Sequence, residues 1–109
     1  MKRWKIQYWD SLEKNNPIDE FLAKLTQQEI ESIFKEIDSL VVDGNELRLP
    51  HSKALGKGLF ELRERRYGYR VYYCFRPGCT IVLLSLGDKA SQEEDIAIAR
   101  ERLLELGEE

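Results

Sequence analysis

The stretch that decides the fold is residues 59–87, which read LFELRERRYGYRVYYCFRPGCTIVLLSLG. Its alternating apolar and polar residues, rich in aromatic and β-branched side chains, are typical of strands, and its internal glycines are typical of short turns. The pattern predicts three consecutive strands joined by two turns. The strands are expected at roughly 59–66, 69–76 and 80–87, and the turns at Tyr67-Gly68 and Pro77-Gly78.

Helical periodicity on both sides of this stretch predicts three helices. Their starts are indicated by a cap followed by proline and by two capping boxes, at Asn16-Pro17, Thr26 to Glu29 and Ser91 to Glu94. Apolar residues then recur every three or four positions, at Ile18, Phe21, Leu22 and Leu25, at Ile30, Ile33, Phe34, Ile37, Leu40 and Val41, and at Ile96, Ala99, Leu103 and Leu106. A short strand is expected at 4–9 and a loop at 43–58.

These elements predict an α+β fold, in which two N-terminal helices pack on one face of a mostly antiparallel twisted sheet. The sheet would hold the N-terminal strand and the three-strand meander, and a C-terminal helix would follow. The length of 109 residues fits a single domain over residues 1–109, which can bury a core without disulfide or metal staples. Cys74 and Cys79 would lie diagonally, so no disulfide is expected between them.

Composition argues against several classes of protein. The apolar runs are only a few residues long, so no membrane span is expected, and the basic start lacks the apolar stretch of a secretory signal. A cytoplasmic location is therefore expected. No phosphate-binding loop or pair of catalytic carboxylates is recognisable, and neither a metal nor a cofactor is expected.

Charge is unevenly distributed along the chain. The net charge is −3, yet residues 48–76 carry eight bases and two acids, a local charge of +6, and the remainder carries −9. Such segregation can attract a polyanion although the whole molecule is acidic. The alternative is an ordinary solvated surface of mixed charge.

The turns predict which side chains share a face of the sheet. With two-residue turns, Arg65 would oppose Arg70, and Arg70 would oppose Ser85. The predicted core face, on which the two helices would pack, holds Phe60, Leu62, Val71, Tyr73, Phe75, Val82, Leu84 and Leu86. The other face holds Glu61, Arg63, Arg65, Arg70, Tyr72, Cys74, Ile81, Leu83 and Ser85.

Three arginines, Arg63, Arg65 and Arg70, would therefore gather on the face away from the core. Like charges directly opposite each other destabilise a sheet, so this grouping needs a reason. One reason is an anion site, because the planar guanidinium suits phosphate. The other is screening by neighbouring glutamates, or packing of the aliphatic stems. Tyr72 beside the arginines would offer a base-stacking surface.

His51 and Lys89 are further candidates. His51 is the only histidine and lies in the basic loop, where it could exchange a proton near neutral pH or be incidental. Lys89 follows Asp88 where the last strand meets the last helix. This position is either at the rim of the basic face or in a solvated turn.

The run KALGKGLFELR…GYRVYY…TIVLLSLGDKASQEEDIAIARERL resembles the RelE/ParE superfamily of bacterial toxins, and more narrowly its HigB-like "addiction module killer protein" branch. That branch typically has a K-x-L-G-x-G loop, an E-L-R strand, G-Y-R-V-Y, and a G-D-K-x-x-Q-x-x-D-I segment that runs into a helix. The resemblance covers roughly residues 17–106. The matching residues are Lys53–Gly58, Glu61–Arg63, Gly68–Tyr72, Gly87–Lys89, Gln92, Asp95 and Ile96.

The resemblance implies a small α+β toxin of a type II toxin–antitoxin system. Most studied members cut mRNA in the ribosomal A site without a metal, by attack of a ribose 2′-OH on the neighbouring phosphate, which needs cations and proton relays. By position, it implies catalytic roles for Arg63, Arg70 and Lys89, with Glu61 as a candidate proton acceptor. RNA contacts are expected from the basic segment, at Lys53, Lys57, Arg65, Arg66, Tyr72 and His51. The expected partners are a cognate antitoxin of the helix-turn-helix class and mRNA on the ribosome.

Two departures from the family pattern keep other functions open. Ribosome-dependent RelE toxins usually carry a basic residue where Glu61 stands, and a tyrosine near the position of Asp95, where this chain has none. Glu61 would be either a proton acceptor or a salt-bridge partner. The alternative functions are ParE-like inhibition of DNA gyrase, which the clustered arginines disfavour, and a toxin-fold binding module without catalysis.

Overall fold

The computed structural model describes residues 3–9 and 17–107. The predicted helix cap Asn16 lies outside the described residues. In chain order the elements are β1 (Lys5–Tyr8), α1 (Pro17–Leu22), α2 (Gln27–Asp43), the 3-10 turn η1 (Gly44–Glu46), β2 (Ser52–Gly56), β3 (Leu59–Arg63), β4 (Arg70–Arg76), β5 (Thr80–Gly87) and α3 (Gln92–Gly107).

The strands form one five-stranded sheet in the order β1-β5-β4-β3-β2. Strand β1 pairs with β5 in parallel, and all the other neighbours are antiparallel. The predicted α+β class and the mostly antiparallel sheet are therefore confirmed. The prediction of a continuous loop over 43–58 is wrong, because β2 forms within it and adds an edge strand beside β3.

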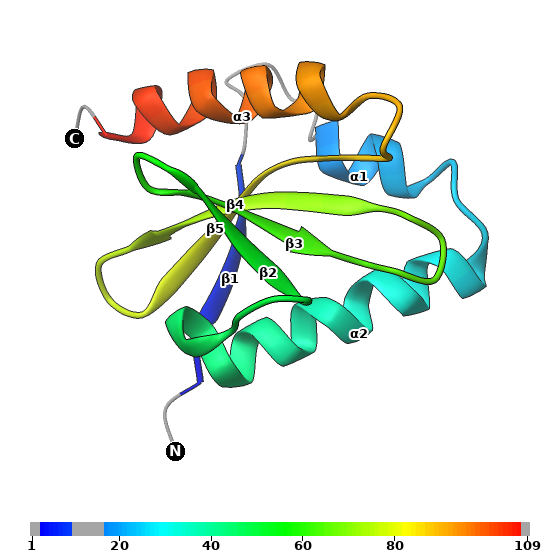
Figure 1. Cartoon of the computed structure of the whole chain (residues 1–109), viewed down its shortest axis with the longest axis horizontal. Helices are drawn as coiled ribbons and strands as arrows, with labels where there is room; N and C mark the ends of the chain where they lie inside the picture. Colours follow the sequence, from blue (N-terminus) through cyan, green and yellow to red (C-terminus); the bar gives the residue numbers. More distant parts are fainter. Residues whose placement is uncertain (1–2, 10–16, 108–109) are drawn as a thin grey trace.

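Both faces of the sheet are covered. Helix α2 lies on one side and α3 on the other, with the strands between them (Figure 1). The α2 side buries Ile18, Ile33, Ile37, Leu40, Leu62, Val71, Tyr73, Ile81, Leu83 and Leu86. The α3 side buries a second cluster, Leu59, Tyr72, Cys74, Val82, Leu84 and Ala99. None of the helices within the described ranges combines the length and the apolar character needed to cross a membrane.

Helix α2 begins and ends where the sequence predicts. The Thr26 hydroxyl accepts the N–H of Glu29 at 3.2 Å, and Glu29 Oε1 accepts the N–H of Thr26 at 2.9 Å, which are the two bonds of a capping box. The helix ends at Asp43, since Gly44 takes a φ of +54°. A side chain at Gly44 would overlap the Trp4 indole, so this glycine also lets the start of the sheet approach α2.

The predicted β4–β5 register is wrong, since Arg70 pairs with Gly87 rather than Ser85, and the predicted faces of β5 are wrong for part of the strand. The β4–β5 turn has three residues rather than two, with Gly78 and Cys79 both at positive φ, so Arg76 pairs with Thr80. The extra residue turns Val82 and Leu84 towards α3 instead of the predicted core face, because a one-residue slip exchanges the faces of a strand. A bulge opposite Tyr72 and Tyr73 then restores the predicted assignment. Ser85 accordingly pairs with Tyr72, and Leu86 with Val71.

Candidate active site

The candidate site is a glutamate held between two arginines. Glu61 Oε1 accepts a hydrogen bond from Arg63 Nε at 2.8 Å, and Glu61 Oε2 lies 3.9 Å from Arg70 Nη1. The Glu61 side chain is only 1% exposed, whereas the side chains of Arg63 and Arg70 are 30% and 19% exposed. A buried carboxylate thus lies beneath two partly accessible guanidinium groups.

Strand pairing explains this arrangement. Arg63 and Arg70 are direct cross-strand partners at the ends of β3 and β4, a placement that repels because both are cations. Glu61 precedes Arg63 by two residues, so it emerges on the same face of β3 and supplies the compensating charge. The arginines in turn satisfy a carboxylate that would be costly to bury alone. The predicted pairing of Arg65 with Arg70 is wrong, because the β3–β4 loop spans residues 64–69.

The first turn of α3 closes one side of the site. Gln92 Nε2 donates to Glu61 Oε2 at 2.9 Å, so both carboxylate oxygens are engaged. The helix start is held by Asp88 Oδ1, which accepts the Ser91 N–H at 3.1 Å, and by the Ser91 hydroxyl, which donates to Asp95 Oδ2 at 2.5 Å. A side chain at Gly87 would overlap that Asp95 carboxylate, and its absence allows α3 to sit close to β5.

Tyr72 lies in the floor of the site. It is the cross-strand partner of Glu61 and is fully buried, so the predicted base-stacking surface at Tyr72 is wrong. Its hydroxyl is buried and has no hydrogen-bond partner among the described residues. Burial and the nearby carboxylates of Glu61 and Asp95 raise the pKa of Tyr72 above its ordinary value, so the hydroxyl keeps its proton at neutral pH. Burial likewise raises the pKa of Asp95.

Two lysines stand near the site. Lys53 on β2 pairs in register with Glu61, and its side chain is exposed at the edge of the sheet. Lys89 is exposed in the turn that follows β5, two residues beyond Gly87, which pairs with Arg70. Both positions add positive charge at the rim of the arginine pair.

The other predicted RNA-binding residues lie elsewhere. Arg65 and Arg66 are exposed in the β3–β4 loop and line a cavity of about 350 Å³ against α2. His51 Nδ1 lies 3.1 Å from Glu36 Oε1 on the same helix. Lys57 is exposed in the β2–β3 turn, at the opposite end of β3 from Arg63. The His51 carbonyl accepts the Arg63 N–H at 2.8 Å, but the His51 side chain, like those of Arg65 and Arg66, contacts the α2 side rather than Glu61.

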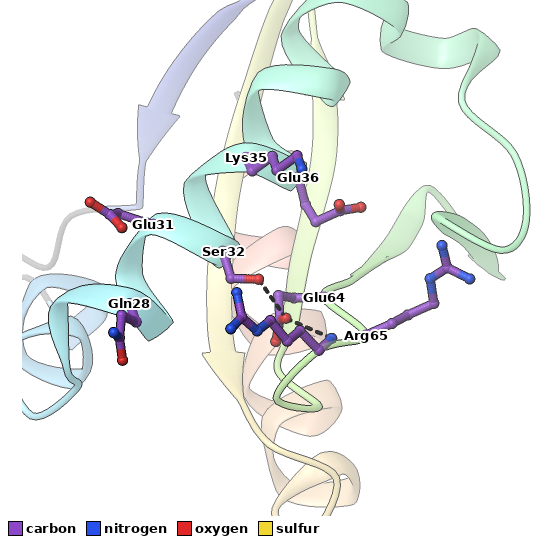
Figure 2. A pocket seen from close by; sticks show the side chains of 8 residues that line it. Gln28, Glu31, Ser32, Lys35, Glu36, Glu64 and Arg65 are labelled. Atoms are coloured by element: carbon purple, nitrogen blue, oxygen red, sulfur yellow. Dashed lines mark hydrogen bonds between the residues drawn. The ribbon is translucent and has the colours of Figure 1, made fainter.

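Glu64 organises the β3–β4 loop, which carries Arg65 and Arg66 (Figure 2). This buried carboxylate accepts the Ser32 hydroxyl at 2.7 Å and the N–H groups of Arg66 at 2.8 Å, Tyr67 at 3.0 Å and Tyr69 at 3.2 Å. Glu64 was predicted only as a screening charge, and Gln92 only as a residue of the family motif. Signals for both were present: an acid in the middle of a basic turn, and an amide in the first turn of a helix that follows the last strand.

No group of three or more His, Cys, Asp or Glu within residues 3–9 and 17–107 could hold a metal ion. The two cysteines, Cys74 and Cys79, are free thiols. The polar residues of the site are therefore arginine, lysine, glutamate, glutamine and tyrosine, a set suited to binding an anion and exchanging a proton.

Solved structures of RelE toxins have the same fold. An E. coli RelE double mutant in the free state superposes with a TM-score of 0.69 at 15% identity, over 92% of this chain and 97% of that one. The isolated E. coli RelE toxin gives 0.59 at 16%, over 87% and 98% of the two chains. The toxin–antitoxin complex RelBE2 from Mycobacterium tuberculosis gives 0.57 at 18%, over 80% and 99%. The fold is thus that of the RelE toxins, as the sequence resemblance predicted.

Sequence comparison identifies the family. The model of the family described as "Phage derived protein Gp49-like (DUF891)" matches residues 20–104, and the chain belongs to this family. An uncharacterized protein of Haemophilus influenzae is 43% identical over 56 residues, which cover 50% of this chain and 57% of that relative. The narrower HigB-like branch remains a prediction.

Proposed function

We propose that this protein is the toxin of a type II toxin–antitoxin pair and that it cleaves mRNA on the ribosome. The single observation that carries the proposal is the pair of partly exposed arginines, Arg63 and Arg70, around the buried Glu61 on a RelE fold. The two arginines and the carboxylate are the cations and the proton acceptor that RNA cleavage without a metal needs, which supports the proposal.

The proposed reaction is attack of a ribose 2′-oxygen on the adjacent phosphorus, with expulsion of the 5′-oxygen. Negative charge grows on the non-bridging phosphate oxygens, and preorganised cations stabilise it. Arg63 and Arg70 present two guanidinium groups from neighbouring strands, which suit a phosphate better than flexible point charges. Lys89 and Lys53 add charge at the rim of the site.

Glu61 is the proposed acceptor of the 2′-OH proton. A carboxylate can take this role when it comes within hydrogen-bond distance of the hydroxyl. Both of its oxygens are engaged in the free protein, by Arg63 and by Gln92. Its use as a base therefore requires at least one of these contacts to be exchanged when RNA binds.

The remaining basic residues are proposed to bind RNA away from the reacting phosphate. Arg65 and Arg66 occupy the β3–β4 loop, and His51 and Lys57 lie at the two ends of the β2–β3 hairpin. An extended strand on the ribosome is long enough to contact several such groups. Phosphate contacts of this kind strengthen binding without reading sequence.

A cognate antitoxin of the helix-turn-helix class is the proposed partner. One of the structurally similar toxins was solved in a toxin–antitoxin complex. An unrestrained ribonuclease would harm its host, so a protein that covers or distorts the arginine site is expected beside it.

Induced expression separates this proposal from two other functions. Mapping of mRNA 5′ ends should reveal new cleavage sites, and a parallel supercoiling assay should show no change. Altered supercoiling with intact mRNA would instead support inhibition of DNA gyrase. Intact mRNA and unchanged supercoiling, in a protein that still binds its antitoxin, would support a binding module without catalysis.

A further inference from the structure

The position between Arg63 and Arg70 is already occupied by an anion, the carboxylate of Glu61. Oε1 lies 2.8 Å from Arg63 Nε, and Oε2 lies 3.9 Å from Arg70 Nη1. Carboxylate and phosphate are the two groups for which the guanidinium fork is best suited. A phosphate that approaches the exposed edges of these arginines therefore competes with a carboxylate fixed in the protein.

Displacing that carboxylate has a cost, because a buried charge needs partners. When phosphate takes the guanidinium groups, Glu61 loses the hydrogen bond from Arg63 and retains Gln92 on the other oxygen. A second donor nearby would lower this cost. Tyr72 is such a donor: it is the cross-strand partner of Glu61 on the same face, and cross-strand partners have their Cβ atoms about 5 Å apart.

The Tyr72 hydroxyl lies near the Glu61 carboxylate, which helps to raise the pKa of Tyr72, but it makes no hydrogen bond of normal geometry to the described residues. The hydroxyl is also buried. An unsatisfied buried hydroxyl destabilises a fold, so its presence requires an explanation. Phenylalanine would fill the same space between β4 and α3 without this cost.

We propose that the Glu61 carboxylate occupies the phosphate position in the free protein. RNA phosphate displaces this carboxylate, which then accepts a hydrogen bond from the Tyr72 hydroxyl. The proposal rests on the proposed RNA-cleaving function and adds a positioning residue to it. Tyr72 touches no substrate and acts through Glu61. The exchange leaves one carboxylate oxygen bonded to Tyr72 and releases the oxygen that Arg63 had engaged, which can then accept the 2′-OH proton.

Binding of a short RNA that cannot be cleaved tests the exchange. The probe is a 2′-O-methyl RNA trinucleotide, whose blocked 2′-oxygen cannot attack, titrated at low salt into the full-length protein. NMR signals of the Arg63 and Arg70 Nε–H groups report binding even when it is weak. Glu61→Gln keeps the shape of the side chain and removes the competing charge, so the trinucleotide should bind about tenfold more tightly. Cleavage by the same variant should fall, because its base is lost.

Tyr72→Phe should weaken trinucleotide binding severalfold when Glu61 is present and have no effect in the Glu61→Gln background. This dependence separates an action through Glu61 from a purely structural role. Tyr73→Phe is the matched control. Tyr73 is equally buried but faces α2, and its hydroxyl pairs with the Ser52 hydroxyl at 2.5 Å, so its loss should affect stability and leave trinucleotide binding unchanged.

The outcomes are distinguishable. Unchanged or weaker binding by Glu61→Gln, or an equal effect of Tyr72→Phe in both backgrounds, would overturn the exchange alone, provided that Arg70→Ala loses binding. If Arg70→Ala binds the trinucleotide as well as the wild type does, the arginine pair is not a phosphate site. The proposed function and the exchange would then fail together.

Discussion

At the scale of one residue, Arg70 is the side chain on which the proposed function depends most. It lies at the start of the central strand β4, directly opposite Arg63, and its long 3.9 Å contact with Glu61 leaves its hydrogen-bonding capacity largely unused. The alternative is a structural arginine that only balances Glu61. Substitution by lysine separates the two roles, because it keeps a cation beside the buried Glu61 carboxylate but removes the planar fork of a catalytic donor.

Arg70→Lys should lower mRNA cleavage about a hundredfold or more, since lysine keeps the charge but loses the planar fork. The melting temperature should barely change. Arg48→Lys is a matched control at an exposed arginine whose side chain donates to the Asn45 and Leu47 carbonyls, and it should retain full activity. Primer-extension mapping after induction measures the first effect, and thermal unfolding measures the second. Full activity of Arg70→Lys would favour the structural role.

Tyr69 carries a prediction about alkaline pH. Its hydroxyl donates to Glu29 Oε2 at 2.5 Å, and this bond raises the pKa of Tyr69 to about 12 from 10.0. A folded-state pKa above the unfolded one means that the contribution to stability is complete below pH 10.0 and is lost as pH rises to about 12. Tyr69→Phe should remove this loss, as measured by urea unfolding across that range. Tyr67→Phe, at an exposed tyrosine of the same loop, should leave the pH dependence in place.

At the scale of an element, the start of α3 depends on one glycine. A methyl group at Gly87 would overlap the Asp95 carboxylate, so Gly87→Ala should force the first turn of α3 away from β5. We expect a loss of about 1–3 kcal/mol in the free energy of unfolding, together with weakened cleavage as Gln92 leaves Glu61.

Two controls test this steric explanation. Gly107→Ala, in the last turn of α3 where a methyl group meets nothing, should be neutral or slightly stabilising. Adding Asp95→Ala to Gly87→Ala should restore part of the lost stability because it makes room for the methyl group. Urea unfolding of the three variants measures these effects, and no recovery in the double variant would count against the collision.

The β3–β4 loop depends on the buried acid Glu64. Glu64→Ala would leave the Ser32 hydroxyl and three backbone N–H groups without their acceptor, and it should cost about 2–3 kcal/mol in the free energy of unfolding. Glu64→Gln keeps one acceptor and should cost less. Glu31→Ala is the control, an exposed acid that lines the same cavity. Urea unfolding ranks the three variants. Equal stability of all of them would show that the β3–β4 loop keeps its conformation without Glu64.

Strand β5 shows where the sequence stops being informative. The apolar run Ile81–Leu84 carries no alternation, so its two faces could be assigned only from the turn before it, and one unrecognised turn residue reversed them. The same run signals a strand buried on both faces, which is the condition that α3 creates. Arg63 and Arg70 were correctly predicted to share a face, because the β3–β4 register is shifted by two residues and this preserves the alternation. The prediction that this face lies away from the core was wrong, because α3 covers it and a second cluster is buried there.

The contacts of Gln92 and Tyr72 could not be predicted in this way. Both depend on where α3 settles over the sheet, a tertiary placement that periodicity within one element does not specify. Local patterns therefore predicted the helices, β1 and the three strands β3 to β5, and they placed Arg63 and Arg70 on one face. They predicted neither the edge strand β2 nor the direct pairing of Arg63 with Arg70. The placement of α3 over the arginine site could not be predicted from these patterns.

At the scale of the whole molecule, three layers place charge where a partner can reach it. Helix α2 and helix α3 cover the two faces of the sheet (Figure 1). The arginine pair at the ends of β3 and β4 stays partly exposed. Residues 48–76 carry +6 within a chain of net charge −3. An antitoxin that neutralises this segment needs an acidic or helical region facing it.

We expect the proposed antitoxin to form a complex with this protein that buries about 1,600 Å² or more in total. If the basic segment contributes, affinity measured by calorimetry should fall as salt rises, because screening weakens exposed charge pairs. Arg70→Ala should abolish growth arrest yet still bind the antitoxin, since one partly exposed arginine is a small part of such an interface. Co-expression that yields neither a complex nor relief of toxicity would refute this partner. A variant that loses toxicity and antitoxin binding together, while remaining folded, would place the antitoxin directly on the arginine pair.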